Sequence, residues 1–199
     1  ARGLGMTVSV LSRPDPAVPT ALSLLKEVFG YPAFRGAQAE IVEHVVDGGD
    51  CLVLMPTGGG KSLCYQIPAL LRAGPGIVIS PLIALMQDQV AALQEAGVRA
   101  AFLNSTQTSA EGYAVESALL AGECDIVYVA PERLLTGRFL NLLERLNSSI
   151  GVALFAIDDA DCVSPWGQDF RPGALKVAML HHALPRVPPI RPTPTPPGA

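Results

Sequence analysis

Residues 55–62 have the types and spacing of a phosphate-binding loop. They read Met-Pro-Thr-Gly-Gly-Gly-Lys-Ser and follow an apolar run at 51–55 that is typical of a buried strand. Successive glycines let backbone N–H groups converge on phosphate oxygens, and the start of the following helix adds positive potential. We expect Lys61 to neutralise charge on the β- and γ-phosphates and Ser62 to offer an oxygen to Mg²⁺. The residues of the expected phosphate site are Thr57, Gly58, Gly59, Gly60, Lys61 and Ser62.

A glycine-rich hairpin with an exposed lysine is the competing interpretation of this loop. The strand expected before it and the helix expected after it disfavour the hairpin. Met55 stands where the strict loop pattern has its first glycine, but the Gly-Lys-Ser end carries most of the chemistry.

Carboxylates follow a second apolar run, at residues 152–157. Because this run reads as a buried strand, Asp158 and Asp159 would emerge at the same sheet edge as the phosphate loop. Carboxylates at this edge suit the binding of Mg²⁺ beside phosphates. An acidic surface turn is the alternative, which the position directly after the strand disfavours. The expected catalytic residues are therefore Lys61, Asp158 and Asp159.

Strand-like and helix-like segments alternate along the chain. We expect strands at 51–55, 77–79, 99–103, 126–129 and 152–157, each nearly continuously apolar. We expect helices at 21–29, 37–46, 81–96, 108–120 and 139–146, and a further one after the phosphate loop. This alternation predicts an α/β fold with a doubly wound parallel sheet, in which ligands bind beyond the carboxyl ends of the strands.

The composition fits one globular domain in 199 residues, with 49% hydrophobic residues and a mean hydropathy of +0.35. We expect a disordered leader at 1–20, the folded domain at 21–184 and an extended, disordered tail at 185–199. Seven of the last 15 residues are proline, so we expect no strand or helix to run through the tail. No apolar run is long enough for a membrane span, and we expect a cytoplasmic protein.

The four cysteines form no C-x-x-C pair and no zinc-finger spacing with histidine. We therefore expect buried, reduced thiols without disulfides, and no zinc. The net charge of −4 gives no general attraction to nucleic acid, so any such binding must come from a local arrangement.

The segment 55–68 closely resembles the RecQ family of superfamily-two helicases, and the resemblance extends from about residue 25 to residue 172. It implies a RecA-like lobe that binds ATP. Residues 29–38 are similar to the family's adenine-recognition motif, in which Gln38 would read the base edge. Tyr31 and Arg35 would stack or pack on the base. Taken alone, Gln38 would be an ordinary residue of a helix surface.

The same resemblance implies contacts with single-stranded or partly duplex DNA. Residues 80–89 and 103–107 resemble motifs that contact the DNA backbone, although Ser80 before Pro81 is equally consistent with plain helix capping. Residues 165–172 resemble the family's aromatic-rich loop, which couples DNA binding to ATP hydrolysis; packing of the tryptophan in the core is the alternative. The implied DNA-contacting residues are Ser80, Asn104, Ser105, Trp166, Phe170 and Arg171.

Two departures from the family pattern bear on activity. In the family's Asp-Glu-Ala-His the Asp holds Mg²⁺ and the Glu acts on the attacking water, roles that the resemblance implies for Asp158 and Asp159. This chain has Asp-Asp-Ala-Asp at 158–161, so the general base is one methylene shorter and an acid replaces the coupling histidine. A displacement of about 1 Å can cost roughly 100-fold in rate, so we expect weakened hydrolysis and preserved binding. The family also continues into a Thr-Ala-Thr-Ala strand, where this chain has prolines, and then into a second lobe that we expect to be absent.

The resemblance implies the first lobe of an ATP-dependent 3'-to-5' DNA helicase of repair or recombination, inactive alone and associated with the nucleoid if bacterial. A non-catalytic ATP- or DNA-binding remnant is the alternative that the altered acidic motif leaves open. A GTPase is disfavoured because the chain has no Asn-Lys-x-Asp motif.

Overall fold

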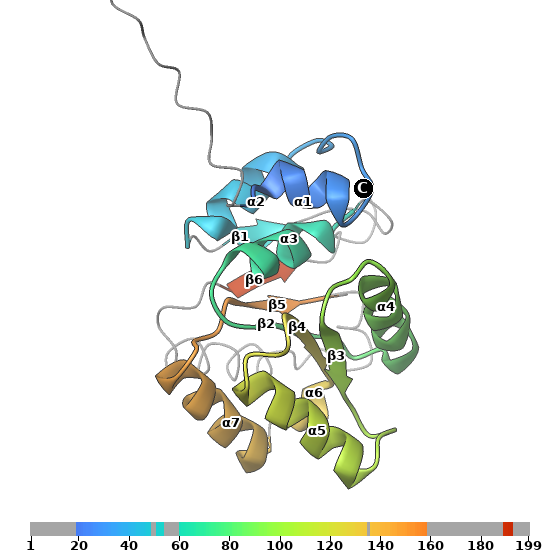
Figure 1. The fold of residues 1–199 in the computed structure, drawn as a ribbon, viewed down its shortest axis with the longest axis vertical. Helices are drawn as coiled ribbons and strands as arrows, with labels where there is room; N and C mark the ends of the chain where they lie inside the picture. Colours follow the sequence, from blue (N-terminus) through green and yellow to red (C-terminus); the bar gives the residue numbers. More distant parts are fainter. Residues whose placement is uncertain (1–18, 49–50, 54–59, 135, 159–188, 193–199) are drawn as a thin grey trace, which may run out of the picture.

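The computed structural model describes residues 19–48, 51–53, 60–134, 136–158 and 189–192. They form a six-stranded parallel sheet in the order β1-β6-β5-β2-β4-β3, with helices on both faces (Figure 1). The predicted α/β class and parallel sheet are confirmed. The strands are β1 (Cys51–Val53), β2 (Gly76–Ile79), β3 (Ala100–Leu103), β4 (Ile126–Val129), β5 (Leu154–Ile157) and β6 (Pro189–Pro192).

Helices connect the strands and cover the sheet. Helices α1 to α3 lie above the sheet in Figure 1, and α5 and α7 lie below it. The longest described helix, α4, has 13 residues, and no helix within the described ranges is long and apolar enough to cross a bilayer. The helices are α1 (Ala21–Glu27), α2 (Gln38–Val46), α3 (Leu63–Leu71), α4 (Ile83–Glu95), α5 (Ser109–Leu120), α6 (Pro131–Leu134) and α7 (Gly137–Ser148).

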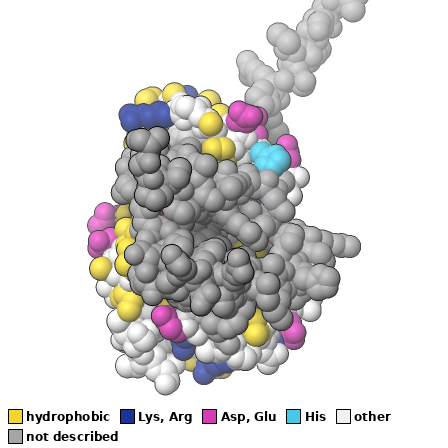
Figure 2. Space-filling view, turned by 180° about the vertical axis from the view of Figure 1, so that it is seen from behind, with side chains coloured by type: hydrophobic (Ala, Val, Ile, Leu, Met, Phe, Trp, Pro, Cys, Tyr) yellow, Lys and Arg dark blue, Asp and Glu magenta, His cyan; other side chains and the backbone are white. Residues whose placement is uncertain are grey.

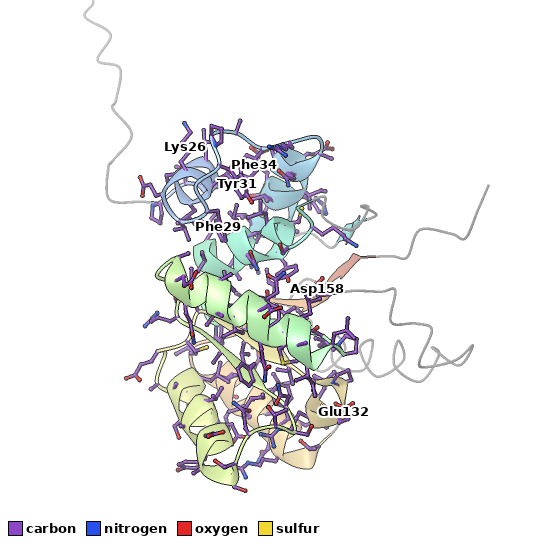
Figure 3. The ribbon with its side chains drawn as sticks, turned by 90° about the vertical axis from the view of Figure 1, so that its right-hand side faces the viewer. Lys26, Phe29, Tyr31, Phe34, Glu132 and Asp158 are labelled. Carbon is purple, nitrogen blue, oxygen red and sulfur yellow. The ribbon has the colours of Figure 1, made fainter. Side chains whose placement is uncertain are left out.

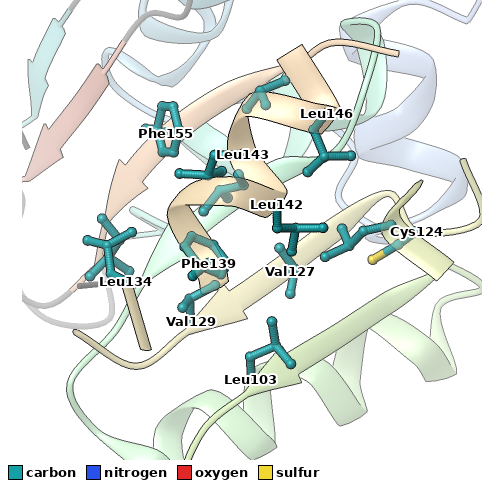
Figure 4. Packing of buried hydrophobic residues seen from close by; sticks show 14 residues of the cluster. Leu103, Cys124, Val127, Val129, Leu134, Phe139, Leu142, Leu143, Leu146 and Phe155 are labelled. Atoms are coloured by element: carbon teal, nitrogen blue, oxygen red, sulfur yellow. The ribbon is translucent and has the colours of Figure 1, made fainter. Parts of the chain in front are cut away.

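The centre of the sheet is buried on both faces, since all four residues of β2 and all four of β4 are buried. In β2, Ile77 and Ile79 belong to one core cluster and Val78 belongs to the other, as the alternation of strand side chains requires. Helices α2, α3 and α4 pack on the face of Val78. Helices α5, α6 and α7 pack on the opposite face, where Leu142, Leu143 and their neighbours on α7 cover β2, β4 and β5 (Figure 4). The continuous apolar runs in the sequence therefore reflect two-sided burial.

Two helix starts test the sequence-based expectations. The predicted capping box of α5 is confirmed, since the Thr108 side chain accepts from the backbone N–H of Glu111 and the Glu111 side chain accepts from that of Thr108. The start of α4 was predicted at Pro81, and this is wrong by two residues. Leu82 has extended dihedral angles, and its side chain makes no capping hydrogen bond, so the helix begins at Ile83. The short helix α6 was not predicted.

The expectation that no strand runs through 185–199 is wrong for β6. This strand pairs with β1 through Ile190 and Arg191, and with β5 through Pro189 and Ile190. Its two prolines are the first and last residues, where a missing N–H costs least, and their fixed φ is compatible with an extended chain. β6 lies beyond residue 184, the expected end of the domain, and at the place where the RecQ resemblance implies a further strand.

The two cysteines whose surroundings are described, Cys64 and Cys124, are buried and form no disulfide. Burial raises the pKa of the Cys124 thiol to about 11. A pKa of about 11 leaves about 0.1% of the thiol ionised at pH 8, whereas an ordinary cysteine is ionised to roughly a quarter.

We therefore expect Cys124 to resist iodoacetamide at pH 8 in the folded protein and to react readily in urea. Its reactivity should increase as the pH rises towards 11, because the thiolate is the reactive form. Peptide mass spectrometry after timed alkylation measures the rate. Equal rates in the folded and unfolded protein would contradict the buried position.

Candidate functional site

The carboxyl ends of the parallel strands meet at one edge of the sheet, and the predicted site residues follow them. β1 leads towards the phosphate loop, β2 ends before Ser80, β3 ends before Asn104 and β5 ends before Asp158. Segments that are far apart in the sequence are thus brought to a common edge, as ligand sites in such sheets require.

Gly60, Lys61 and Ser62 form the described end of the phosphate loop and lead directly into α3. The first bonds of the helix run from the backbone N–H of Leu63 to Gly60 O (3.3 Å) and from that of Gln66 to Ser62 O (2.9 Å). The Ser62 side chain makes no capping hydrogen bond, so it is not used in starting the helix. Lys61 and Ser62 thus lie next to each other at the start of α3, and their contacts with phosphate and Mg²⁺ stay predictions. Thr57, Gly58 and Gly59 lie outside the described residues.

Gln38, at the start of α2, is bonded to the phosphate loop. Its side chain is 4% exposed; its Oε1 accepts from the backbone N–H of Arg35 (2.8 Å), and its Nε2 donates to the backbone carbonyl of Gly60 (3.3 Å). Gly60 has a φ of 76°, and an added Cβ would lie 2.3 Å from the Nε2 of Gln38. The backbone conformation therefore favours glycine here, and a larger residue would displace the Gln38 amide.

We expect Gly60→Ala to lower the affinity for ATP by about 2- to 10-fold, because the new methyl group displaces the Gln38 amide and one neutral hydrogen bond is lost. Gly122→Ala is the matched control, since Gly122 has a φ of 72° and nothing within 4 Å of an added Cβ. Both variants carry the same kind of backbone strain. Titration of a fluorescent ATP analogue measures the affinities, and equal affinities in the two variants would exclude the proposed role of the contact.

Tyr31 and Arg35 lie in the segment between α1 and α2, and both are exposed. Tyr31 is 46% exposed, and Figure 3 shows it with Phe34 near the helices α1 and α2. Phe34 instead packs partly against the cluster of α1, α2 and α3. The ring of Tyr31 is thus accessible to a ligand, and its contact with adenine stays a prediction.

Asp158 directly follows β5 and is only 8% exposed. Its backbone N–H donates to Ile79 O (2.9 Å), which continues the pairing of β5 with β2, and its Oδ2 accepts from the hydroxyl of Tyr65 (2.7 Å). Figure 3 shows Asp158 next to β6. Asp159 lies outside the described residues.

Tyr65 belongs to a buried polar network that the sequence analysis did not find. Its hydroxyl lies 2.9 Å from that of Tyr128 on β4, and the two rings meet edge to face. The Nε2 of Gln66 donates to the Tyr128 hydroxyl (3.0 Å) and to the Oε1 of Gln89 on α4 (3.2 Å). The available signal was the pair Tyr65-Gln66 within an otherwise apolar helix. Burial raises the pKa of both tyrosines, so both hydroxyls stay protonated near neutral pH.

Ser62 and Asp158 have the donor chemistry that Mg²⁺ prefers, since both offer oxygen. Among the described residues, no three His, Cys, Asp or Glu side chains are grouped so that they could hold a metal. In phosphate-binding loops Mg²⁺ needs few protein ligands, because the nucleotide phosphates also bind it. One hydroxyl and one carboxylate are typical there. The residues present therefore fit a nucleotide-bound Mg²⁺.

The predicted DNA-contacting residues differ in their exposure. Ser80 is 1% exposed, and its hydroxyl has no hydrogen-bond partner in the described structure, so its position gives no support for a direct DNA contact. Asn104 is 2% exposed, and its Oδ1 accepts from the backbone N–H of Thr106, which holds the turn after β3. Ser105 is exposed on that turn. The remaining three, Trp166, Phe170 and Arg171, lie outside the described residues.

The described surface has no concentrated positive charge on the face in Figure 2. The lysine and arginine side chains visible there lie in separate places, at the upper left and near the bottom, and the protein has a net charge of −4. Two of the described arginines also pair with carboxylates, Arg99 with Asp125 and Arg138 with Glu116. Binding of nucleic acid by the described part of this face would therefore depend on local contacts.

Comparison with known proteins gives the family. The profile of the DEAD/DEAH box helicases matches residues 35–190. The chain is 48% identical over 170 residues to the ATP-dependent DNA helicase RecQ of Haemophilus influenzae, and 48% identical over 165 residues to that of Bacillus subtilis. These alignments cover 85% and 82% of this chain and 27% of each relative. The chain thus spans about a quarter of the length of these relatives.

Solved helicase structures share the fold. A hypothetical ATP-dependent RNA helicase from Sulfolobus tokodaii superposes with a TM-score of 0.64 at 19% identity, covering 89% of this chain and 51% of that one. The DUF1998 helicase MrfA bound to DNA and AMPPNP superposes with a TM-score of 0.58 at 21% identity, covering 74% and 22%. The fold, the phosphate loop and the profile match agree: the chain belongs to the DEAD/DEAH box helicase family and is related to the RecQ helicases.

Proposed function

We propose that this chain is the ATP-binding lobe of a RecQ-like DNA helicase that couples ATP hydrolysis to 3'-to-5' unwinding in repair or recombination. The observation that carries the proposal is the joint placement of Lys61 and Ser62 at the start of α3 and Asp158 at the end of β5. Tyr65 joins the two groups, because it lies on α3 and donates to Asp158.

In this proposal Lys61 neutralises phosphate charge, and Ser62 and Asp158 hold Mg²⁺, which withdraws charge from the phosphates when bound. Gln38 reads the adenine edge, with Tyr31 and Arg35 against the base. In the structure the Gln38 amide already binds Arg35 N and Gly60 O. Adenine would form hydrogen bonds with the second N–H of this amide and with the second lone pair of its oxygen.

DNA contacts are proposed for Ser105, which is exposed at the end of β3, and for the aromatic segment with Trp166, Phe170 and Arg171. Aromatic rings bind single-stranded DNA by base stacking, which needs no broad positive surface. Unwinding is proposed for the whole protein, because the part of this chain that matches the relatives covers only 27% of their length. Action on DNA would place it in the cytoplasm, at the nucleoid if the source is bacterial.

Nucleotide selectivity tests the proposal. A fluorescent ATP analogue should bind the chain in the presence of Mg²⁺, ATP should displace it, and GTP should displace it much more weakly. Equal displacement by ATP and GTP would contradict adenine recognition. Absence of nucleotide binding by the folded chain would overturn the proposed function.

The sequence Asp158-Asp159-Ala160-Asp161 favours a second candidate, a nucleotide- or DNA-binding protein without turnover. Steady-state ATPase measurements with and without single-stranded DNA separate the two. DNA-stimulated turnover that Lys61→Ala abolishes would support the helicase lobe. ATP binding without turnover, also when the chain is supplied as part of a protein of the relatives' length, would support the second candidate.

A further inference from the structure

The inference concerns the carboxylate of Asp158 and therefore rests on the proposed function. Its starting observation is a row of four buried or partly buried polar side chains that runs from α4 through α3 and β4 to the end of β5. These are Gln89, Gln66, Tyr128 and Tyr65, and the row ends on the Oδ2 of Asp158.

The number of available protons fixes the direction of these hydrogen bonds. An ionised carboxylate only accepts, so the single O–H of Tyr65 is directed at Asp158. The bond between the two tyrosines must then be donated by Tyr128. Because Tyr128 has used its own proton, it accepts from Gln66, whose second N–H goes to Gln89. The donors therefore run from Gln66 through Tyr128 and Tyr65 to Asp158, an arrangement in which each bond strengthens the next, while Gln66 also donates to Gln89 on the other side.

The torsion that rotates an aspartate carboxylate about its last bond is soft, so an external hydrogen bond is needed to fix the plane of the oxygens. Tyr65 supplies one, and its own position is fixed because the residue is 2% exposed and its ring packs against Tyr128. It also lies on α3 three residues after Ser62, about one helical turn. The same helix thus sets the position of the Ser62 hydroxyl and the orientation of the Asp158 carboxylate.

We propose that Tyr65 is a positioning residue that orients the Asp158 carboxylate towards nucleotide-bound Mg²⁺, and that Tyr128 and Gln66 hold Tyr65 in place. Hydrogen-bond partners of metal-binding carboxylates act in this way, and their loss costs about 10- to 100-fold in metal affinity. Through Gln89 the row also reaches α4, the helix that follows the Ser80 segment.

The test is the gain in ATP affinity that Mg²⁺ produces, measured with a fluorescent ATP analogue at a series of free Mg²⁺ concentrations and in EDTA. Tyr65→Phe removes only the hydroxyl. We expect it to raise the Mg²⁺ concentration needed for half of the gain by about 10-fold, while affinity in EDTA stays unchanged. Tyr113→Phe removes the same atom from a side chain that is 64% exposed on α5, and should leave both values unchanged.

A purely structural role for Tyr65 would lower the melting temperature and reduce affinity equally with and without Mg²⁺, and that result would overturn the inference. Tyr128→Phe leaves the bond between Tyr65 and Asp158 in place and should shift the Mg²⁺ dependence less than Tyr65→Phe. If Tyr65→Phe does not fold, the inference depends on Tyr128→Phe, and an unchanged Mg²⁺ dependence in that variant overturns it. If Tyr65→Phe and the unmodified chain depend on Mg²⁺ in the same way, only the inference is overturned. If the unmodified chain does not bind the nucleotide at all, the proposed function is overturned as well.

Discussion

Lys61→Ala is expected to lower the affinity of the chain for Mg-ATP by about 10- to 100-fold, the cost of losing hydrogen bonds from a charged group to phosphate. Lys61 lies at the start of α3, where the helix N-terminus and the glycine loop already favour anions. In the proposed site, the Lys61 ammonium group interacts with the β- and γ-phosphates. Binding of a fluorescent ATP analogue measures the loss.

AMP provides an internal control for this variant, because it has no β- or γ-phosphate. Its affinity should change little in Lys61→Ala. Lys26→Ala is the matched control protein, since Lys26 is exposed in the last turn of α1 and its removal changes the net charge equally. An equal loss of ATP and AMP affinity would contradict the assignment of Lys61 to the terminal phosphates.

The sheet could be predicted from the sequence because its strands are short apolar runs that are buried on both faces. Ile77 and Val78 point to opposite faces and are both fully buried, so no polar residue interrupts the pattern. β6 could not be predicted in this way. Its pairing with Cys51–Val53 and with β5 depends on neighbours that are more than 30 residues away, and local proline content predicts the opposite.

The site could be predicted where function requires a fixed order of residues, as at Gly60, Lys61 and Ser62. Long-range hydrogen bonds could not be predicted. Nothing in the local sequence shows that Gln38 binds the carbonyl of Gly60, or that Tyr65 binds Asp158 across 93 positions. Burial could not be predicted for Ser80 either: its position after β2 resembles that of a contact residue, its hydroxyl is buried, and its contact with DNA stays a prediction.

Asp158→Asn is expected to reduce the Mg²⁺-dependent gain in ATP affinity by about 10- to 100-fold or more. Removing a hydrogen-bond partner of a metal ligand already costs about 10- to 100-fold in metal affinity, and removing the ligand itself should cost at least as much. The amide is neutral and binds Mg²⁺ more weakly than a carboxylate does. Folding should be retained, because the Tyr65 hydroxyl can donate to the amide oxygen as it does to Oδ2 of Asp158.

In EDTA the same substitution should not lower the affinity for ATP. Without a metal, the buried negative charge of Asp158 opposes the phosphates of ATP, so removing it should leave affinity unchanged or raise it. Asp47→Asn is the matched control, since Asp47 is exposed at the end of α2, near the amino end of β1 and therefore at the opposite edge of the sheet. ATP titrations of both variants with and without Mg²⁺ measure the two effects. A loss of affinity in Asp158→Asn that is equal in EDTA and in Mg²⁺ would show that Asp158 maintains the local structure and does not bind the metal.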